Sequence, residues 1–305
     1  MPPNCSGSRS LNEPDGQHRS GYDPAVATEL VAEAADLMRA LGFTASHVVL
    51  IGGLVPSLLV PVLDPGIEPH VGTADLDLCL SIALVEGQTE TYERMEAVLR
   101  DRGFEVGDVT FRWHRRAGLA LTVEFFCPAG EDRPAGQVFR PSAAANPTGK
   151  HNFGGRLSAL ALEAGELLTR DVEEVTQLVE LPQGRGRYEA RVRVTGPLAF
   201  LVAKIDALRD RDKPKDAYDI VWLIESWPGG PVAAAKAFGQ RPAYHDEQVW
   251  AAVRRLGEMF ADPGRVGARS YARFVATDPT EEPVLERRAV GAIAEFIEAL
   301  PPREQ

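Results

Sequence analysis

Residues 72–82, with the letters GTADLDLCLSI, constrain the fold of this chain more than any other segment. Polar and apolar side chains alternate strictly along them, which is the period of a β-strand with one buried and one polar face. Asp75 and Asp77 share the polar face, so both carboxylates point to one side with Cα atoms about 7 Å apart. Such a pair can bind a hard cation, although two solvated carboxylates at a sheet edge fit the pattern equally well.

A glycine turn precedes this strand. The β-branched run HVVLI predicts a short buried strand that ends at Gly52 and Gly53, with a helix from about Leu54. Because glycine has no side chain, backbone N–H groups and the N-terminus of the following helix can approach phosphate oxygens at such a turn. Most glycine pairs are ordinary turns. A phosphate-binding role for this pair is supported only by its position ahead of the paired aspartates.

A third carboxylate is expected beside the first two. The runs VTFRWHRR and GLALTVEFF predict a hairpin around Ala117–Gly118, and alternation in its second arm places Glu124 on the face opposite its apolar neighbours. Acidic side chains on adjacent strands can bind one or two Mg²⁺ ions beside a triphosphate. Asp75, Asp77 and Glu124 are therefore the candidate metal ligands, and Mg²⁺ is the expected cofactor.

The remaining patterns predict an α+β protein in three parts. Residues 1–22 are polar and rich in Gly, Pro and Ser, which is typical of a disordered tail. Residues 23–195 form a core of strands and helices, and residues 196–305 form a helical domain. Within the core we expect helices at 24–41 and 90–102, a loop or lid at 128–155, and a strand meander at 157–195 with turns at Gly165 and Gln183–Gly184. The later helices are expected at 198–211, 215–226, 246–261 and 283–299.

Charge and composition exclude several classes of protein. A formal net charge of -11 argues against a protein that coats nucleic acid, so a polynucleotide substrate would need a local basic patch. The three cysteines are too widely spaced for a disulfide framework or a CxxC zinc site, and the six histidines are scattered. No signal peptide and no apolar run of membrane-spanning length is present. We therefore expect a cytoplasmic protein that does not enter a membrane.

Basic side chains near residue 204 complement the acidic set. In a helix at 198–211, Lys204 and Arg211 are seven residues apart and lie on one face, where they could neutralise triphosphate charge. Asp216 and Asp219 share a face of the next helix, where one of them could orient Lys204 or Arg211. A solvated face of surface salt bridges, with Asp216 complementing the helix dipole, stays open as the structural alternative.

Taken together, these blocks resemble a known family. A glycine pair, a helix, a TxDxD strand and a later carboxylate form the signature of the nucleotidyltransferase superfamily, whose core is DNA polymerase β-like. The stretch KIDALRDRDKPKDAYDIVWLI resembles the conserved block of AbiEii-like toxins, nucleotidyltransferases of type IV toxin–antitoxin systems related to the mycobacterial MenT toxins. The resemblance covers residues 47–227.

The resemblance implies a role for each matching residue. Gly52, Gly53 and Thr73 would hold the triphosphate of a nucleotide, with Arg211 as a further nucleotide-binding cation. Lys204 matches the catalytic lysine of the family, and Asp219 matches its later aspartate. Two positions depart from the family pattern, because Leu54 stands where many members have a small hydroxyl residue and Glu124 stands where Asp is commoner. These departures leave the nucleotide preference in doubt.

The implied reaction is Mg²⁺-dependent transfer of a nucleoside monophosphate from an NTP to an acceptor hydroxyl. The resemblance suggests the 3′ end of tRNA as the acceptor and a cognate antitoxin as a partner. Modification of a small molecule or a protein, and a catalytically silent interaction protein, remain as alternatives. Basic runs could contact an RNA backbone or be charged strand faces in water: Arg112, His114, Arg115 and Arg116, and separately Arg185, Arg187, Arg191 and Arg193.

Overall fold

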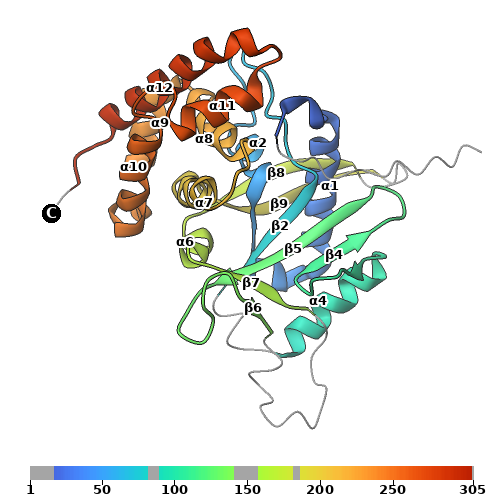
Figure 1. Ribbon diagram of the computed structural model, residues 1–305. Coiled ribbons are helices and arrows are strands. Elements are labelled where there is room, and N and C mark those ends of the chain that lie inside the picture. The colour runs from blue at the N-terminus through green and yellow to red at the C-terminus, as the bar shows by residue number, and fades with distance from the viewer. Residues whose placement is uncertain (1–16, 82–88, 141–156, 181–185, 304–305) are drawn as a thin grey trace, which may run out of the picture.

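A mixed β-sheet runs through the centre of the computed structural model, which describes residues 17–81, 89–140, 157–180 and 186–303 (Figure 1). The main path of the sheet has the order β3-β4-β5-β2-β1-β9-β8, and β7 and β6 continue from β5. β2 is parallel to β5 and β1 is parallel to β9, while the other pairs along the main path are antiparallel. The strands are β1 (Val48–Ile51), β2 (Asp75–Leu80), β3 (Glu105–Val106), β4 (Arg112–Arg115), β5 (Leu121–Pro128), β6 (Val138–Phe139), β7 (Ala159–Leu162), β8 (Val172–Glu180) and β9 (Arg187–Thr195).

The alternation along β2 determines what each face of the sheet meets. Its three leucines pack in one hydrophobic cluster with α1 (Pro24–Leu41) and α4 (Thr89–Asp101). Cys79, on the opposite face, belongs to a second cluster that includes α6 (Gly165–Arg170) and α7 (Pro197–Asp210). The paired aspartates share the face of Cys79, so they point toward α7. The expected extension of this strand to Ile82 lies outside the described residues.

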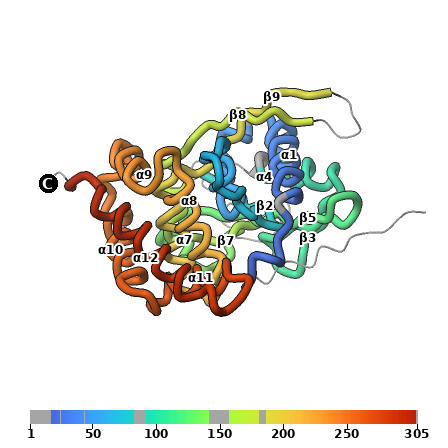
Figure 2. The backbone as a smooth tube through the Cα atoms, turned by 90° about the horizontal axis from the view of Figure 1, so that it is seen from above, coloured from blue at the N-terminus to red at the C-terminus, as the bar shows by residue number. Residues whose placement is uncertain are grey.

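The chain after residue 196 is helical, as expected. Following α7 come α8 (Lys215–Glu225), α9 (Gly230–Gly239), α10 (Glu247–Met259), α11 (Val266–Val275) and α12 (Glu282–Ala299). Figure 2 shows these helices gathered on one side of the sheet and α1 on the other. Their core is continuous with the sheet, because Val49 and Ile51 of β1 share a cluster with residues of α7 through α12. The structure thus confirms the α+β architecture of a mixed sheet followed by helices.

Two helices of the C-terminal half were not predicted from the sequence. α9 buries only Ala234, Ala235 and Phe238, so its alanine-rich sequence shows little of the apolar stripe that marks an amphipathic helix. α11 is short, and like α9 it was not expected.

The prediction of a strand meander at 157–195 is wrong, because the three strands of this segment are not neighbours in the sheet in sequence order. β7 lies beside β5 and β6, whereas the β8–β9 hairpin joins the sheet next to β1. Gly165 begins α6 instead of forming a turn. A Cβ there would lie 2.5 Å from the Cα of Pro128, so the glycine allows α6 to pack directly against the end of β5. The expected turn at 183–184 and most of the loop at 128–155 lie outside the described residues, although β6 falls within that loop region.

Residues 17–22, the described part of the expected tail, lie against the C-terminal helices. The side-chain amide of Gln17 donates to the carbonyl of Asp212, and the ring of Tyr22 lies 5.7 Å from that of Phe274. Residues 1–16 lie outside the described part of the chain. Among the described residues, no helix has both the length and the apolar character needed to cross a membrane.

Candidate active site

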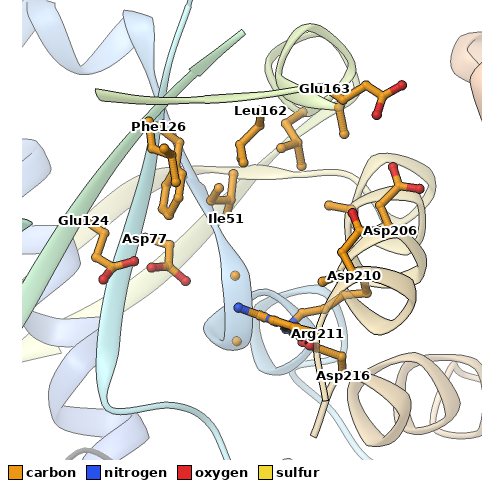
Figure 3. Close-up of a pocket in the computed structure, with 18 of the residues that line it drawn as sticks. Ile51, Asp77, Glu124, Phe126, Leu162, Glu163, Asp206, Asp210, Arg211 and Asp216 are labelled. Carbon is orange, nitrogen blue, oxygen red and sulfur yellow. Dashed lines mark hydrogen bonds and ion pairs between the residues drawn. The ribbon is translucent and has the colours of Figure 1, made fainter. Parts of the chain in front are cut away.

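A cleft of about 450 Å³ lies between the polar face of the sheet and helices α7 and α8 (Figure 3). Its volume falls in the range of small-molecule sites. All of the expected site residues except Asp219 line it: Gly52, Gly53, Thr73, Asp75, Asp77, Glu124, Lys204 and Arg211. Segments far apart in the sequence therefore meet around one cavity.

The acidic wall comes from the parallel pair β2 and β5. Asp77 is the register partner of Glu124, and Figure 3 shows the two carboxylates side by side at the cleft. Burial raises the pKa of Asp77 to about 7, and the negative charge of Glu124 adds to the rise. Cations across the cleft oppose this only in part: Lys204, Lys213 and Arg211. Two carboxylates that destabilise each other in this way are stabilised by a bound cation.

Mg²⁺ commonly takes one or two protein carboxylates and completes its shell with water and substrate phosphates. Asp77 and Glu124, with Asp75 nearby on the same strand face, supply oxygen donors of this type. Within the described ranges, no group of three or more His, Cys, Asp or Glu side chains is placed to hold a metal ion on its own. The donor set therefore fits a cation that is shared with a bound triphosphate.

Arg112 adds a contact that the sequence did not predict. It faces Glu124 across the antiparallel pair β4 and β5, and its Nε donates to Glu124 Oε1 at 2.5 Å. Arg112 also lines the cleft. It was considered only as part of a basic run, because its partner could not be known before the strand register was known.

The glycine turn packs directly against the acidic wall. Gly52 has a φ of +77°, and a Cβ at this residue would lie 1.9 Å from Asp77 Oδ2. A Cβ on Gly53 would lie 2.8 Å from the Cβ of Thr73 and 3.0 Å from Lys215 Nζ. The turn continues into α2 (Val55–Leu59). The two glycines thus bring backbone, not side chains, to the centre of the cleft.

The basic wall comes from the α7–α8 region. Lys204 Nζ donates to Asp216 Oδ1 at 2.8 Å, and Arg211 Nε donates to Asp216 Oδ2 at 2.8 Å. The expected helical face shared by Lys204 and Arg211 is wrong, since α7 ends at Asp210 and Arg211 is extended with φ -143°. The shared carboxylate of Asp216, rather than helical spacing, holds the two cations together.

Asp219 lies beneath this wall and not among the residues that line the cleft. Its side chain is completely buried, and Lys204 Nζ and Lys215 Nζ lie 2.6 Å and 2.7 Å from its two oxygens. Burial would lower the pKa of Lys204, but the charges of Asp216 and Asp219 outweigh burial and raise it. The two carboxylates therefore favour the charged form of Lys204, and Asp219 contributes by holding it.

Lys215 is a further cleft residue that the sequence analysis missed. It precedes Asp219 by four residues in α8, and the spacing of such a pair was the available signal. Burial lowers the pKa of Lys215, and the charge of Asp219 opposes this. Its ammonium group lies next to the glycine turn and Thr73, where a phosphate would be expected.

The far end of the cleft combines an apolar surface with the carboxylates of Glu163 and Asp206. Phe126 and Leu162 extend into it from β5 and β7, as Figure 3 shows, and Phe200 of α7 also lines it. An apolar surface next to paired charges of both signs suits a ligand with a planar ring system at one end and phosphates at the other.

A protein family and a solved structure are similar to this chain. Residues 72–302 match the family described as nucleotidyl transferase AbiEii toxin, type IV TA system. A crystal structure of an antigenic nucleotidyltransferase-like protein from Paracoccidioides brasiliensis is similar with a TM-score of 0.40 and 15% identity, over 81% of this chain and 94% of that one. No curated protein matches the sequence. The family match spans most of the chain and includes every expected site residue except the glycine pair. The chain therefore belongs to the AbiEii nucleotidyl transferase toxin family of type IV toxin–antitoxin systems.

Proposed function

We propose that this chain is a Mg²⁺-dependent nucleotidyltransferase that moves a nucleoside monophosphate from an NTP to an acceptor hydroxyl. The observation that carries the proposal is a single cleft with a carboxylate wall on β2 and β5 and a lysine wall on α7 and α8. In the reaction, the acceptor oxygen forms a bond to the α-phosphorus, the bond from the α-phosphorus to the bridging oxygen of the β-phosphate breaks, and pyrophosphate leaves.

Each wall has a separate task in this proposal. Asp75, Asp77 and Glu124 would hold Mg²⁺, which offsets triphosphate charge and lowers the pKa of the attacking hydroxyl. Lys204 and Lys215 would face the phosphates from the other side and stabilise the charge that develops on the leaving pyrophosphate. The backbone N–H groups near Gly53 and the hydroxyl of Thr73 would orient the triphosphate. Glu124 assists as a metal ligand or as the base that accepts the hydroxyl proton.

Membership in a type IV toxin–antitoxin family implies a cognate antitoxin as the partner. The 3′ end of tRNA is the acceptor that we propose from the resemblance of the sequence to the mycobacterial MenT toxins. Growth arrest on expression of the chain, relieved by co-expression of the antitoxin, would support the toxin role.

Ion pairs within the two basic runs favour a second class of acceptor, a small molecule or a protein. Much of the charge of the two basic runs is already paired within the protein: Arg112 with Glu124, Arg115 with Glu33, and Arg187 with Glu180. Arg185 lies outside the described residues. With a net charge of -11, this pairing favours a small molecule or a protein as the acceptor over a polyanion.

Transfer of label from α-³²P-labelled NTPs tests the proposal. The wild-type chain, Asp77→Asn and Asp64→Asn would each be incubated with Mg²⁺ and with total tRNA, cell protein or small-molecule extract. We expect transfer by the wild type and by Asp64→Asn, an exposed loop carboxylate, and loss of transfer in Asp77→Asn. The acceptor fraction that becomes labelled identifies the substrate class.

Two outcomes would contradict the proposal. Equal transfer by Asp77→Asn and the wild type would exclude the carboxylate wall as the metal site. Absence of transfer, together with absence of Mg²⁺-dependent NTP binding in calorimetry, would instead indicate a silent interaction protein.

A further inference from the structure

The imidazole of His70 is fully buried and bonded through both of its nitrogens. Its Nδ1 accepts a hydrogen bond from the backbone N–H of Gly72 at 3.0 Å, and its Nε2 lies 2.9 Å from Asp219 Oδ1. Because Nδ1 acts as the acceptor, the proton of the neutral ring lies on Nε2 and is donated to Asp219. Burial lowers the pKa of His70 to about 4, although Asp219 opposes the shift. One neutral tautomer is therefore fixed by its two partners.

Asp219 is the point where three donors meet. The same Oδ1 that accepts from His70 also accepts from Lys215, and Oδ2 forms the ion pair with Lys204. Burial would raise the pKa of Asp219, but Lys204, Lys215 and His70 together lower it well below its usual value. The orientation of this carboxylate therefore helps to set the positions of both lysines, together with Asp216 in the case of Lys204.

His70 also ties the basic wall to the acidic wall. The ring stacks on Tyr218 of α8 at 5.1 Å and meets Trp222 edge-on at 4.9 Å. Through Gly72 it holds the backbone that leads directly into Thr73 and the paired aspartates of β2. A single side chain thus contacts the segment before β2 on one side and the anchor of the lysines on the other.

We propose that His70 is a positioning residue that fixes, through Asp219, the ammonium groups of Lys204 and Lys215 relative to the phosphate-binding segment before β2. Lysine is a compact charge on a flexible stem, so its placement depends on what holds the ammonium group. Without the Nε2 donor, Asp219 retains only its two lysines, and the carboxylate is free to rotate toward one of them. The inference rests on the phosphate site of the proposed function, but it concerns phosphate binding and not transfer.

Two substitutions separate the two bonds of the imidazole. In His70→Gln, the side-chain amide can place an N–H near the position of Nε2, while the acceptor for Gly72 is lost. In His70→Asn, the carbonyl oxygen can replace Nδ1 as the acceptor, but the shorter side chain does not reach Asp219. Tyr218→Phe is the matched control, because it removes the hydrogen bond from the Val71 N–H at 3.2 Å and leaves Asp219 untouched.

Calorimetry with inorganic tripolyphosphate and Mg²⁺ measures the effect without an acceptor or a reaction. We expect His70→Asn to weaken binding by about tenfold or more, the range seen when a supporting hydrogen bond behind a functional group is removed. His70→Gln and Tyr218→Phe should stay within about threefold of the wild type, even where thermal unfolding shows that stability has dropped. Equal weakening in His70→Asn and His70→Gln, or wild-type binding by His70→Asn, would overturn the inference.

The wild-type protein provides a second measurement that does not depend on the folding of a variant. Long-range ¹H–¹⁵N spectra should show His70 as the neutral Nε2–H tautomer, with an Nε2 resonance that moves when tripolyphosphate binds. An Nδ1–H tautomer, or a wild-type chain that does not bind tripolyphosphate, would contradict the inference. A wild type that binds tripolyphosphate but transfers no nucleotide would contradict the proposed function alone.

Discussion

At Gly52 the backbone and the active site impose separate requirements on one residue. The φ of +77° disfavours any residue with a Cβ, at a cost of about 1–2 kcal/mol. A Cβ would in addition lie 1.9 Å from Asp77 Oδ2, so an alanine would displace this carboxylate. The first effect is on stability, and the second is on the site.

Gly52→Ala and Gly66→Ala separate the two effects. Gly66 also has a positive φ, of +90°, but no atom lies within 4 Å of the position of its Cβ. We expect the free energy of unfolding, measured in urea, to fall by about 1–2 kcal/mol in both variants, because alanine is strained in the left-handed conformation. Only Gly52→Ala should also lose transfer activity, by about a hundredfold, since a catalytic group displaced by about 1 Å has an effect of this size. Full activity in Gly52→Ala would show that Asp77 is not needed where the structure places it.

The sequence predicted site residues where local rules suffice. Asp75, Asp77 and Glu124 follow from strand alternation, which fixes the face of a side chain once the strand is recognised. Arg112 and His70 were missed because their roles depend on partners on other elements. Lys215 was missed although its partner Asp219 lies four residues later in the same helix. His70 and Asp219 are far apart in the sequence, and no short motif links them. Family resemblance identified Asp219, which is buried and forms ion pairs with Lys204 and Lys215.

At the scale of elements, the buried carboxylate of Asp216 is one of two that link α8 to α7, the other being Asp219. Asp216 lies in the first turn of α8 and pairs with Lys204 of α7 and with Arg211 just beyond it. Burial would raise the pKa of Asp216, but Lys204 and Arg211 outweigh burial and lower it. A depressed pKa means that the carboxylate stabilises the fold above its unfolded-state pKa, and that this contribution is lost as the pH falls.

Asp216→Asn should destabilise the protein by about 3 kcal/mol near neutral pH, because it leaves a buried lysine without one of its charge partners. Asp212→Asn is the matched control, since Asp212 forms an exposed pair with Arg273, and its loss should cost less than about 1 kcal/mol. Urea unfolding as a function of pH measures both. The difference in unfolding free energy between the wild type and Asp216→Asn should narrow as the pH falls below about 4, because the Asp216 carboxylate of the unfolded chain is protonated there while the depressed pKa of the folded protein keeps its carboxylate charged. A gap that is constant with pH would show that the ion pairs do not stabilise the fold.

The elements themselves were predictable to different degrees. Long amphipathic helices such as α1 and the alternating strands β2 and β5 were recognised because their period is strong. The prediction of a meander at 157–195 was wrong because it placed strands that are adjacent in sequence next to each other in the sheet. A single sequence does not reveal that β7 instead pairs in parallel with β5. Arg211 shows the same limit on a smaller scale, because helical spacing was continued one residue beyond the end of α7.

On the scale of the whole molecule, the cleft exists because two halves of the chain close on each other. The sheet contributes the acidic wall and the glycine turn, and α7 and α8 contribute the basic wall. The hydrophobic cluster that joins β1 to the C-terminal helices holds these walls together. Charges of both signs are present on each side, since Arg112 pairs with Glu124 on the sheet and Asp216 and Asp219 pair with the lysines of α7 and α8. The proposed ligand, a triphosphate with its Mg²⁺, would complement the carboxylates on one side and the lysines on the other.

Location of the metal in a complex tests this central claim most directly. Crystals grown with Mn²⁺ and a non-hydrolysable NTP would give an anomalous difference map that marks the metal independently of any assumed chemistry. We expect the strongest peak at the carboxylates of Asp77 and Glu124, with the triphosphate between it and the ammonium groups of Lys204 and Lys215. A metal and nucleotide bound elsewhere on the molecule, with this cleft empty, would contradict the claim.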